Sequence, residues 1–181
     1  MKINLRELVD IQKKVDERIK ENWNRPVDAE GLILAFNVEL FEYFNAIGIW
    51  KWWKNNHKID RFRILDELSD LFAFYISLMN LKIEVGGKDI VDEIEEDIEM
   101  LIERFSSYAE SSDLSQKDLI IDFITYVATD SEMDYSVTIT ERFALSIYLS
   151  TLLFEGITWD EITEAYHYKS AVNIQRQDEN Y

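Results

Sequence analysis

Two pairs of carboxylates interrupt the most apolar parts of the chain. Glu39 and Glu42 stand inside "LILAFNVELFEYF", and Glu67 and Asp70 stand inside "ILDELSDLFAF". Each pair has an i, i+3 spacing, which places both carboxylates on one face of a helix. Unpaired charges are costly to bury. Two such helices packed antiparallel would form a four-carboxylate cage that binds hard divalent cations.

The same spacing also fits a simpler arrangement, in which the carboxylates lie on exposed helix edges. The segment "DEIEEDIEM" repeats it at Glu93, Glu96 and Glu99, and there a solvated helix face is expected. The apolar surroundings distinguish the first two pairs from this segment, and for them the cage and the exposed edge are equally open.

Basic and aromatic residues gather between the two carboxylate pairs, in "IGIWKWWKNNHK". Lysines such as Lys54 could reach a phosphate chain that a metal holds. The alternative is a hydrophobic plug of tryptophans with lysines extending to water. On these residues alone a plug of Trp50, Trp52 and Trp53 is favoured, and we expect Trp50 and Trp52 to be core residues.

The last segment carries Lys169, Asn173 and Arg176 at i, i+4 and i+7, which is one helical face with two cations and an amide. Such a face could hold phosphate oxygens. Basic residues also suit the negative end of any final helix, so this pattern alone does not decide its role.

The elements that must position these groups are predicted to be helices. The chain of 181 residues has one proline and five glycines, and its apolar residues recur at spacings of three and four. We predict one all-α helical bundle without linkers, with helices at about 5–22, 28–49, 62–81, 88–105, 117–128, 137–156 and 159–177. Residues 106–116 are expected to be a loop, and β-branched residues leave a short strand open near 137. Thr158 and Glu161 form a capping box for the last helix.

The composition excludes several classes of function. A net charge of −17 argues against binding to nucleic acid or to an anionic membrane. The absence of cysteine excludes disulfides and thiolate chemistry. Neither a signal peptide nor a membrane-spanning run is found, so a cytoplasmic protein is expected.

Read together, these segments resemble the dimeric all-α dUTPases, relatives of the MazG-type nucleoside triphosphate pyrophosphatases. "IQKKVDERI" looks like the nucleoside-recognition helix of that family, "VELFEYFN" like its E-x-x-E block and "LDELSDLFAFYISL" like its E-x-x-D block. "WKWWKN" looks like the segment between them, and "YKSAVNIQRQDENY" like the closing signature of the phage-type members.

The resemblance implies a homodimer that hydrolyses dUTP to dUMP and pyrophosphate with two or more Mg²⁺ ions per site. This reaction limits uracil incorporation into DNA and supplies dUMP. Glu39, Glu42, Glu67 and Asp70 would be the metal ligands, and Glu39 would activate the attacking water.

The remaining site residues are carried over in the same way. The implied phosphate ligands are Lys54, Lys169, Arg176 and Tyr181. The implied nucleoside-binding residues are Gln12, Asp16, Trp53 and Asn173. Asp16 stands where many relatives carry Asn, which leaves its contact with the base in doubt.

Three points stay open on the sequence. Residues 82–134 match the family loosely and are expected to be a variable helical insert within a single domain, 1–181. Hydrolysis of dCTP or another pyrimidine nucleotide is the alternative activity. A more remote alternative is a non-enzymatic acidic protein that binds a partner through acids spread over its surface.

Overall fold

The computed structural model describes residues 2–22, 28–55, 58–129 and 135–179. These residues form seven α-helices and no β-strand, which confirms the all-α prediction. The helices are α1 (Arg6–Asn22), α2 (Ala29–Ile47), α3 (Arg61–Gly86), α4 (Val91–Ser111), α5 (Gln116–Thr129), α6 (Tyr135–Leu153) and α7 (Trp159–Asp178). Pro26, expected near the start of the second helix, lies outside the described residues.

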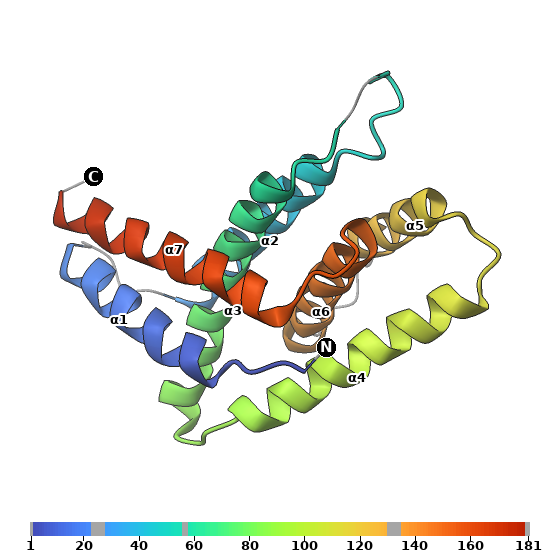
Figure 1. Cartoon of the computed structure of the whole chain (residues 1–181). Helices are drawn as coiled ribbons and strands as arrows, with labels where there is room; N and C mark the ends of the chain where they lie inside the picture. Colours follow the sequence, from blue (N-terminus) through green and yellow to red (C-terminus); the bar gives the residue numbers. More distant parts are fainter. Residues whose placement is uncertain (1, 23–27, 56–57, 130–134, 180–181) are drawn as a thin grey trace.

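The central helix is α3, which contacts α1, α2, α6 and α7, whereas α4 and α5 both contact α6. Figure 1 shows α1, α2, α3 and α7 gathered on one side of the molecule and α4, α5 and α6 on the other. The connection 48–60 joins the adjacent ends of α2 and α3, which therefore run antiparallel (Figure 1).

Local signals in the sequence set the helix ends. The side chain of Asp60 accepts the backbone N–H of Phe62 at 3.0 Å and starts α3. Gly48 ends α2 with φ 57°, a left-handed conformation that glycine adopts without strain. Thr158 Oγ1 accepts the N–H of Glu161 at 3.2 Å and starts α7 where the sequence predicts.

The core lies around α3, as its nearly continuous apolar sequence predicts. Phe36 and Tyr43 of α2, Phe72 of α3 and Phe143 of α6 are fully buried. Tyr75 stacks on Phe143 with ring centroids 3.9 Å apart. Burying a large apolar side chain stabilises a fold by about 1.5–3 kcal/mol, so these contacts fix the positions of the helices that carry the carboxylates.

The predicted loop at 106–116 is wrong over its first half, because α4 continues to Ser111. Serines favour turns in isolation. Here the hydroxyl of Tyr108 donates to Asp122 at 2.9 Å, and its ring meets Phe123 with centroids 5.6 Å apart. These contacts with α5 favour the additional helical turn.

Other boundaries also differ from the prediction: α6 ends at Leu153 instead of 156, and α2 ends at Ile47 instead of 49. The helix α3 continues past Leu81 to Gly86, and Gly87 ends it with φ 64°. The short strand left open near 137 is not formed, because α6 is helical from Tyr135. No helix in the described part of the chain is both long and apolar enough to cross a membrane.

The segment before α1 is fixed to α4. Ile3 and Leu5 are buried, and their backbone N–H groups donate to Glu99 at 2.8 Å and Glu95 at 2.5 Å. The first residue of α1, Arg6, forms ion pairs with α4 and the turn before it. The N-terminal end of α1 is thereby held beside α4.

Candidate active site

Three of the four predicted metal ligands converge where α2 and α3 face each other. Carboxylate oxygens of Glu39, Glu67 and Asp70 lie within 4.8 Å of one another, and all three side chains are partly buried. Glu39 comes from α2, and the other two come from successive turns of α3. Oxygen ligands at this separation fit a hard divalent cation.

Glu42 lies at the edge of this cluster. It is exposed and does not belong to the group of three whose oxygens converge. Its charge still raises the pKa of Glu39 and of Glu67, so the three residues lie near one another. The structure therefore brings together three carboxylates and leaves the fourth beside them.

The cluster is electrostatically strained in the metal-free chain. Burial, followed by the charges of Asp70, Glu42 and Glu67, raises the pKa of Glu39 to about 7. Burial also raises the pKa of Glu67 and of Asp70. A cation between these groups would relieve the repulsion and favour their ionised forms.

The final helix supplies a cation to the cluster. Lys169 Nζ lies 2.8 Å from Asp70 and 2.9 Å from Asp66. Burial lowers the pKa of Lys169, but its hydrogen bonds to these two carboxylates outweigh that effect and raise it. Asp66 was not predicted from the sequence as a site residue. Its i, i+4 spacing from Asp70 could have indicated that the two carboxylates share a helix face.

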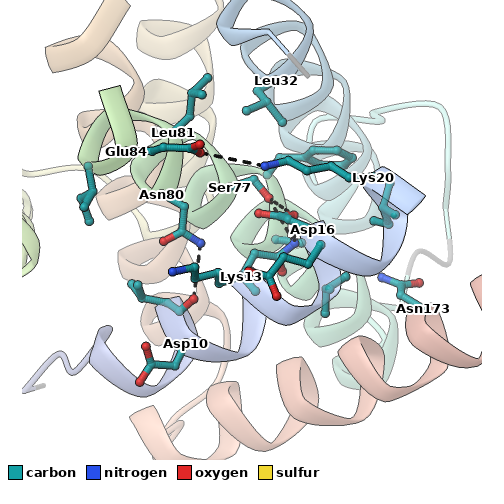
Figure 2. Close-up of a pocket in the computed structure, with 18 of the residues that line it drawn as sticks. Asp10, Lys13, Asp16, Lys20, Leu32, Ser77, Asn80, Leu81, Glu84 and Asn173 are labelled. Carbon is teal, nitrogen blue, oxygen red and sulfur yellow. Dashed lines mark hydrogen bonds and ion pairs between the residues drawn. The ribbon is translucent and has the colours of Figure 1, made fainter. Parts of the chain in front are cut away.

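A cavity of about 800 Å³ extends from the cluster between α1, α2, α3 and α7. Its lining includes Glu39 and Asp70 at the cluster, Gln12 and Asp16 on α1, and Asn173 and Arg176 on α7. Predicted metal, nucleoside and phosphate residues thus border one space. Figure 2 shows Asp16, Ser77 and Asn80 side by side on its wall, with Asn173 beyond them.

Gln12 borders this cavity but is almost entirely buried, with 3% of its surface exposed. Its Nε2 donates to Asp16 at 2.8 Å and to Ser77 at 3.1 Å, and its Oε1 accepts the hydroxyl of Tyr166 at 2.7 Å. These contacts use every polar group of the amide. The half-buried carboxylate of Asp16 is the group this network orients beside the cavity.

Ser77 and Tyr166 are further residues that the sequence reading missed. Ser77 donates to Asp16 at 2.7 Å. It lies two helical turns beyond Asp70, a spacing that indicates a shared helix face. Nothing in the sequence pairs Tyr166 with Gln12, since the two are far apart in the chain.

The aromatic segment between α2 and α3 is separate from the cavity. Trp53 and Lys54 are both exposed in the connection 48–60, and neither contributes to the cavity lining. The ring of Trp53 packs edge-on against Trp50 and Trp52, with centroids 5.5 Å and 5.7 Å apart. The structure does not bring these two predicted ligands to the other site residues.

The expectation that Trp50 and Trp52 are core residues is wrong. Trp52 is 85% exposed, and Trp50 is also exposed. Residues 48–55 extend beyond the end of α2 (Figure 1), and the rings of Trp50 and Trp52 each pack edge-on against Trp53 rather than into the core. Tyr181, a predicted phosphate ligand, lies outside the described residues.

An all-α fold with converging carboxylates and cationic side chains around one cavity is suited to an enzyme that binds a metal and an anionic substrate. The sequence model of the dUTPase family matches residues 4–181, and the chain belongs to this family. No curated protein matches the chain. Family membership makes the chain a dUTP diphosphatase, which hydrolyses dUTP to dUMP. Members of this family generally use divalent metal ions, for which the three carboxylates are suitable ligands.

Proposed function

We propose that this dUTP diphosphatase depends on Mg²⁺, acts in the cytoplasm, and binds two or more ions at Glu39, Glu67 and Asp70, with Glu42 completing the site. The convergence of three carboxylates, two of which line the cavity, carries this proposal. Bound magnesium would offset the triphosphate charge and stabilise charge that develops during the reaction. The raised pKa of the carboxylates supports a site that is completed by cations.

Glu39 is the proposed general base. A carboxylate at this position can orient a water molecule and accept its proton as the oxygen attacks phosphorus. The bond between the α- and β-phosphate groups breaks, dUMP and pyrophosphate separate, and the proton on Glu39 returns to solvent. Its position on the cavity lining supports this role.

The phosphate groups are proposed to lie along α7. Lys169 already faces the carboxylates, and Arg176, two helical turns further along α7, lines the cavity. Both side chains carry the charge that triphosphate oxygens require. Lys54 and Tyr181 complete the proposed phosphate ligands on the basis of the family signature alone.

The nucleoside is proposed to bind between α1 and α7, near Asp16 and Asn173. Both line the cavity, and the amide of Gln12 holds Asp16 in place. Trp53 remains a proposed stacking partner for the base. It would have to approach the cavity, because the structure has it on the exposed connection.

A homodimer is proposed through the exposed face of α2. Leu34, Val38 and Phe41 are large apolar residues at i, i+4 and i+7, and all three are exposed. A continuous apolar stripe of this kind is typical of a surface that another protein covers. Because the chain resembles a family of dimers, we propose that a second copy of this chain covers the stripe.

A substrate panel tests the proposed specificity. Pyrophosphate release would be measured from dUTP, dCTP, dTTP and UTP, with Mg²⁺ and with EDTA. We expect dUTP to give the highest kcat/KM and EDTA to abolish turnover. Preference for dCTP would establish the alternative pyrimidine activity, and full turnover in EDTA would contradict the metal site. Failure to hydrolyse any nucleotide would favour the acidic binding protein.

A further inference from the structure

Lys169 is shared between two carboxylates of α3 that differ in their surroundings. Its Nζ lies 2.8 Å from Asp70 Oδ2 and 2.9 Å from Asp66 Oδ1. Only 14% of the Lys169 side chain is exposed, whereas 56% of the Asp66 side chain is exposed. The ammonium group therefore lies between an inner carboxylate and an outer one.

The inner carboxylate has two competing partners. Asp70 contributes to the cluster with Glu39 and Glu67, and it also pairs with Lys169. A divalent cation in the cluster would take oxygen atoms of Asp70 and repel the ammonium group, because both are positively charged. Lys169 then needs an acceptor that is outside the cluster and within reach.

Asp66 meets both conditions. It lies one helical turn before Asp70 on the same face of α3, and it already accepts from Lys169. It is not among the converging carboxylates. An ammonium group that keeps this contact stays at the edge of the cluster, two helical turns before Arg176, which lines the cavity.

We infer that Asp66 is a positioning residue, which retains Lys169 beside the carboxylate cluster when a metal ion takes Asp70 and so keeps the ammonium group available to the substrate phosphates. This inference rests on the proposed metal site. The inference gives Asp66 a role although it lies outside the metal site. It also implies that Lys169 loses its contact with Asp70 and keeps its contact with Asp66 when a metal ion binds.

The inference predicts opposite changes in metal affinity. Asp66→Asn leaves Lys169 dependent on Asp70, so Mg²⁺ should bind more weakly, by on the order of three- to tenfold. Lys169→Met removes the competitor for Asp70, so Mg²⁺ should bind more tightly. The change in local charge alone also predicts weaker Mg²⁺ binding for the first variant and tighter binding for the second. A double-mutant cycle is therefore needed to separate this charge effect from positioning through Lys169.

The experiment is a calorimetric titration of MgCl₂ into the full chain without nucleotide, for wild type, D66N, K169M and D66N/K169M. If Asp66 acts through Lys169, D66N should weaken binding in the wild-type background and change it by less than about twofold in the K169M background. An equal weakening in both backgrounds would show that Asp66 contributes only its charge, and would overturn the inference while leaving the metal site intact.

Three controls complete the design. Glu164→Gln removes an exposed carboxylate from α7 outside this pair and should leave Mg²⁺ affinity unchanged. Asp66→Glu keeps the carboxylate and should restore most of the affinity. Thermal melting in EDTA checks that each variant folds. A folded wild-type chain that binds no Mg²⁺ would overturn the proposed metal site and this role of Asp66 with it.

Steady-state kinetics give a second readout. At saturating Mg²⁺, D66N should raise the KM for dUTP several-fold and change kcat little, because it weakens the placement of a phosphate-binding group. K169M should raise KM further, and adding D66N to it should have no additional effect. A loss of kcat in D66N with KM unchanged would contradict the positioning role.

Discussion

At the scale of single residues, the environment of Glu39 separates it from the other acids of this strongly acidic chain. It is partly buried, and three other carboxylates act on it. Its pKa of about 7 means that the metal-free carboxyl group is substantially protonated at neutral pH. A cation in the cluster would favour the ionised form, which is the form that can accept a proton.

Glu39→Gln should lower kcat by about 10²–10⁴-fold, because the amide cannot accept a proton from water. Pyrophosphate release at saturating dUTP and Mg²⁺ measures this effect, and far-ultraviolet circular dichroism should be unchanged. Glu30→Gln on the same helix is the control, since Glu30 is exposed in the first turn of α2. Near-normal turnover in E39Q would remove Glu39 from the proposed mechanism.

The raised pKa of Glu39 also predicts how stability depends on pH. Its ordinary value is 4.5 and its folded value is about 7. Between these values the folded chain retains a proton that the unfolded chain has released, so a rise in pH favours unfolding. In EDTA, the Tm should therefore fall as the pH is raised through this window.

Two comparisons test that assignment. E39Q removes the titrating group, so its Tm in EDTA should depend less on pH than that of wild type. Mg²⁺ should stabilise wild type more at pH 7 than at pH 5, because binding competes with a proton at the lower pH. A wild-type Tm that rises over the same window in EDTA would contradict the prediction.

At the scale of elements, α4 gives part of the predicted insert a structural role. Glu95 and Glu99 accept the N–H groups of Leu5 and Ile3, which are buried immediately before α1. The helix α1 carries Asp16, and its position relative to α3 sets the width of the cavity. We therefore expect α4 to influence nucleotide binding through the position of α1.

Replacing both acceptors with alanine, in E95A/E99A, should leave two N–H groups without partners and lower the free energy of unfolding by about 1–3 kcal/mol. Hydrogen exchange at Ile3 and Leu5 should accelerate, and the KM for dUTP should rise. E95Q/E99Q is the matched control, because its amide oxygens can still accept. Unchanged exchange in the alanine variant would contradict the proposed attachment.

At the scale of the whole molecule, the exposed stripe on α2 indicates an additional interface. The opposite side of α2 packs on α3 and contributes to the core, so the stripe is not needed to bury this helix within one chain. Its three large apolar side chains lie in a chain whose net charge of −17 otherwise favours separation of copies.

Leu34→Glu/Val38→Glu should convert the dimer to a monomer, because each protomer would bury unpaired charges at the interface. Sedimentation equilibrium should give about twice 21.5 kDa for wild type and 21.5 kDa for the variant. Val85→Glu is the control, since Val85 is exposed near the end of α3, outside the stripe. A monomeric wild type would exclude this interface.

The sequence by itself determined the helical class, the approximate place of each helix and the family. Apolar spacing of three and four residues predicts helices, and capping residues such as Asp60 and Thr158 act within one turn, so both can be read locally. The carboxylate pairs were also readable, because i, i+3 spacing places each pair on one face. The approach of Glu39 to Glu67 and Asp70 was expected, but it depends on how α2 packs on α3.

Only the tertiary structure decided which groups meet and which reach solvent. Tyr166 donates a hydrogen bond to Gln12, which is more than 150 residues away in the chain. Lys169 pairs with Asp66 as well as with Asp70. Trp52 is exposed although a run of tryptophans is typical of a hydrophobic core. Spacing fixes positions around one helix, whereas the contacts of a side chain depend on how several helices pack, and that packing is a property of the whole chain.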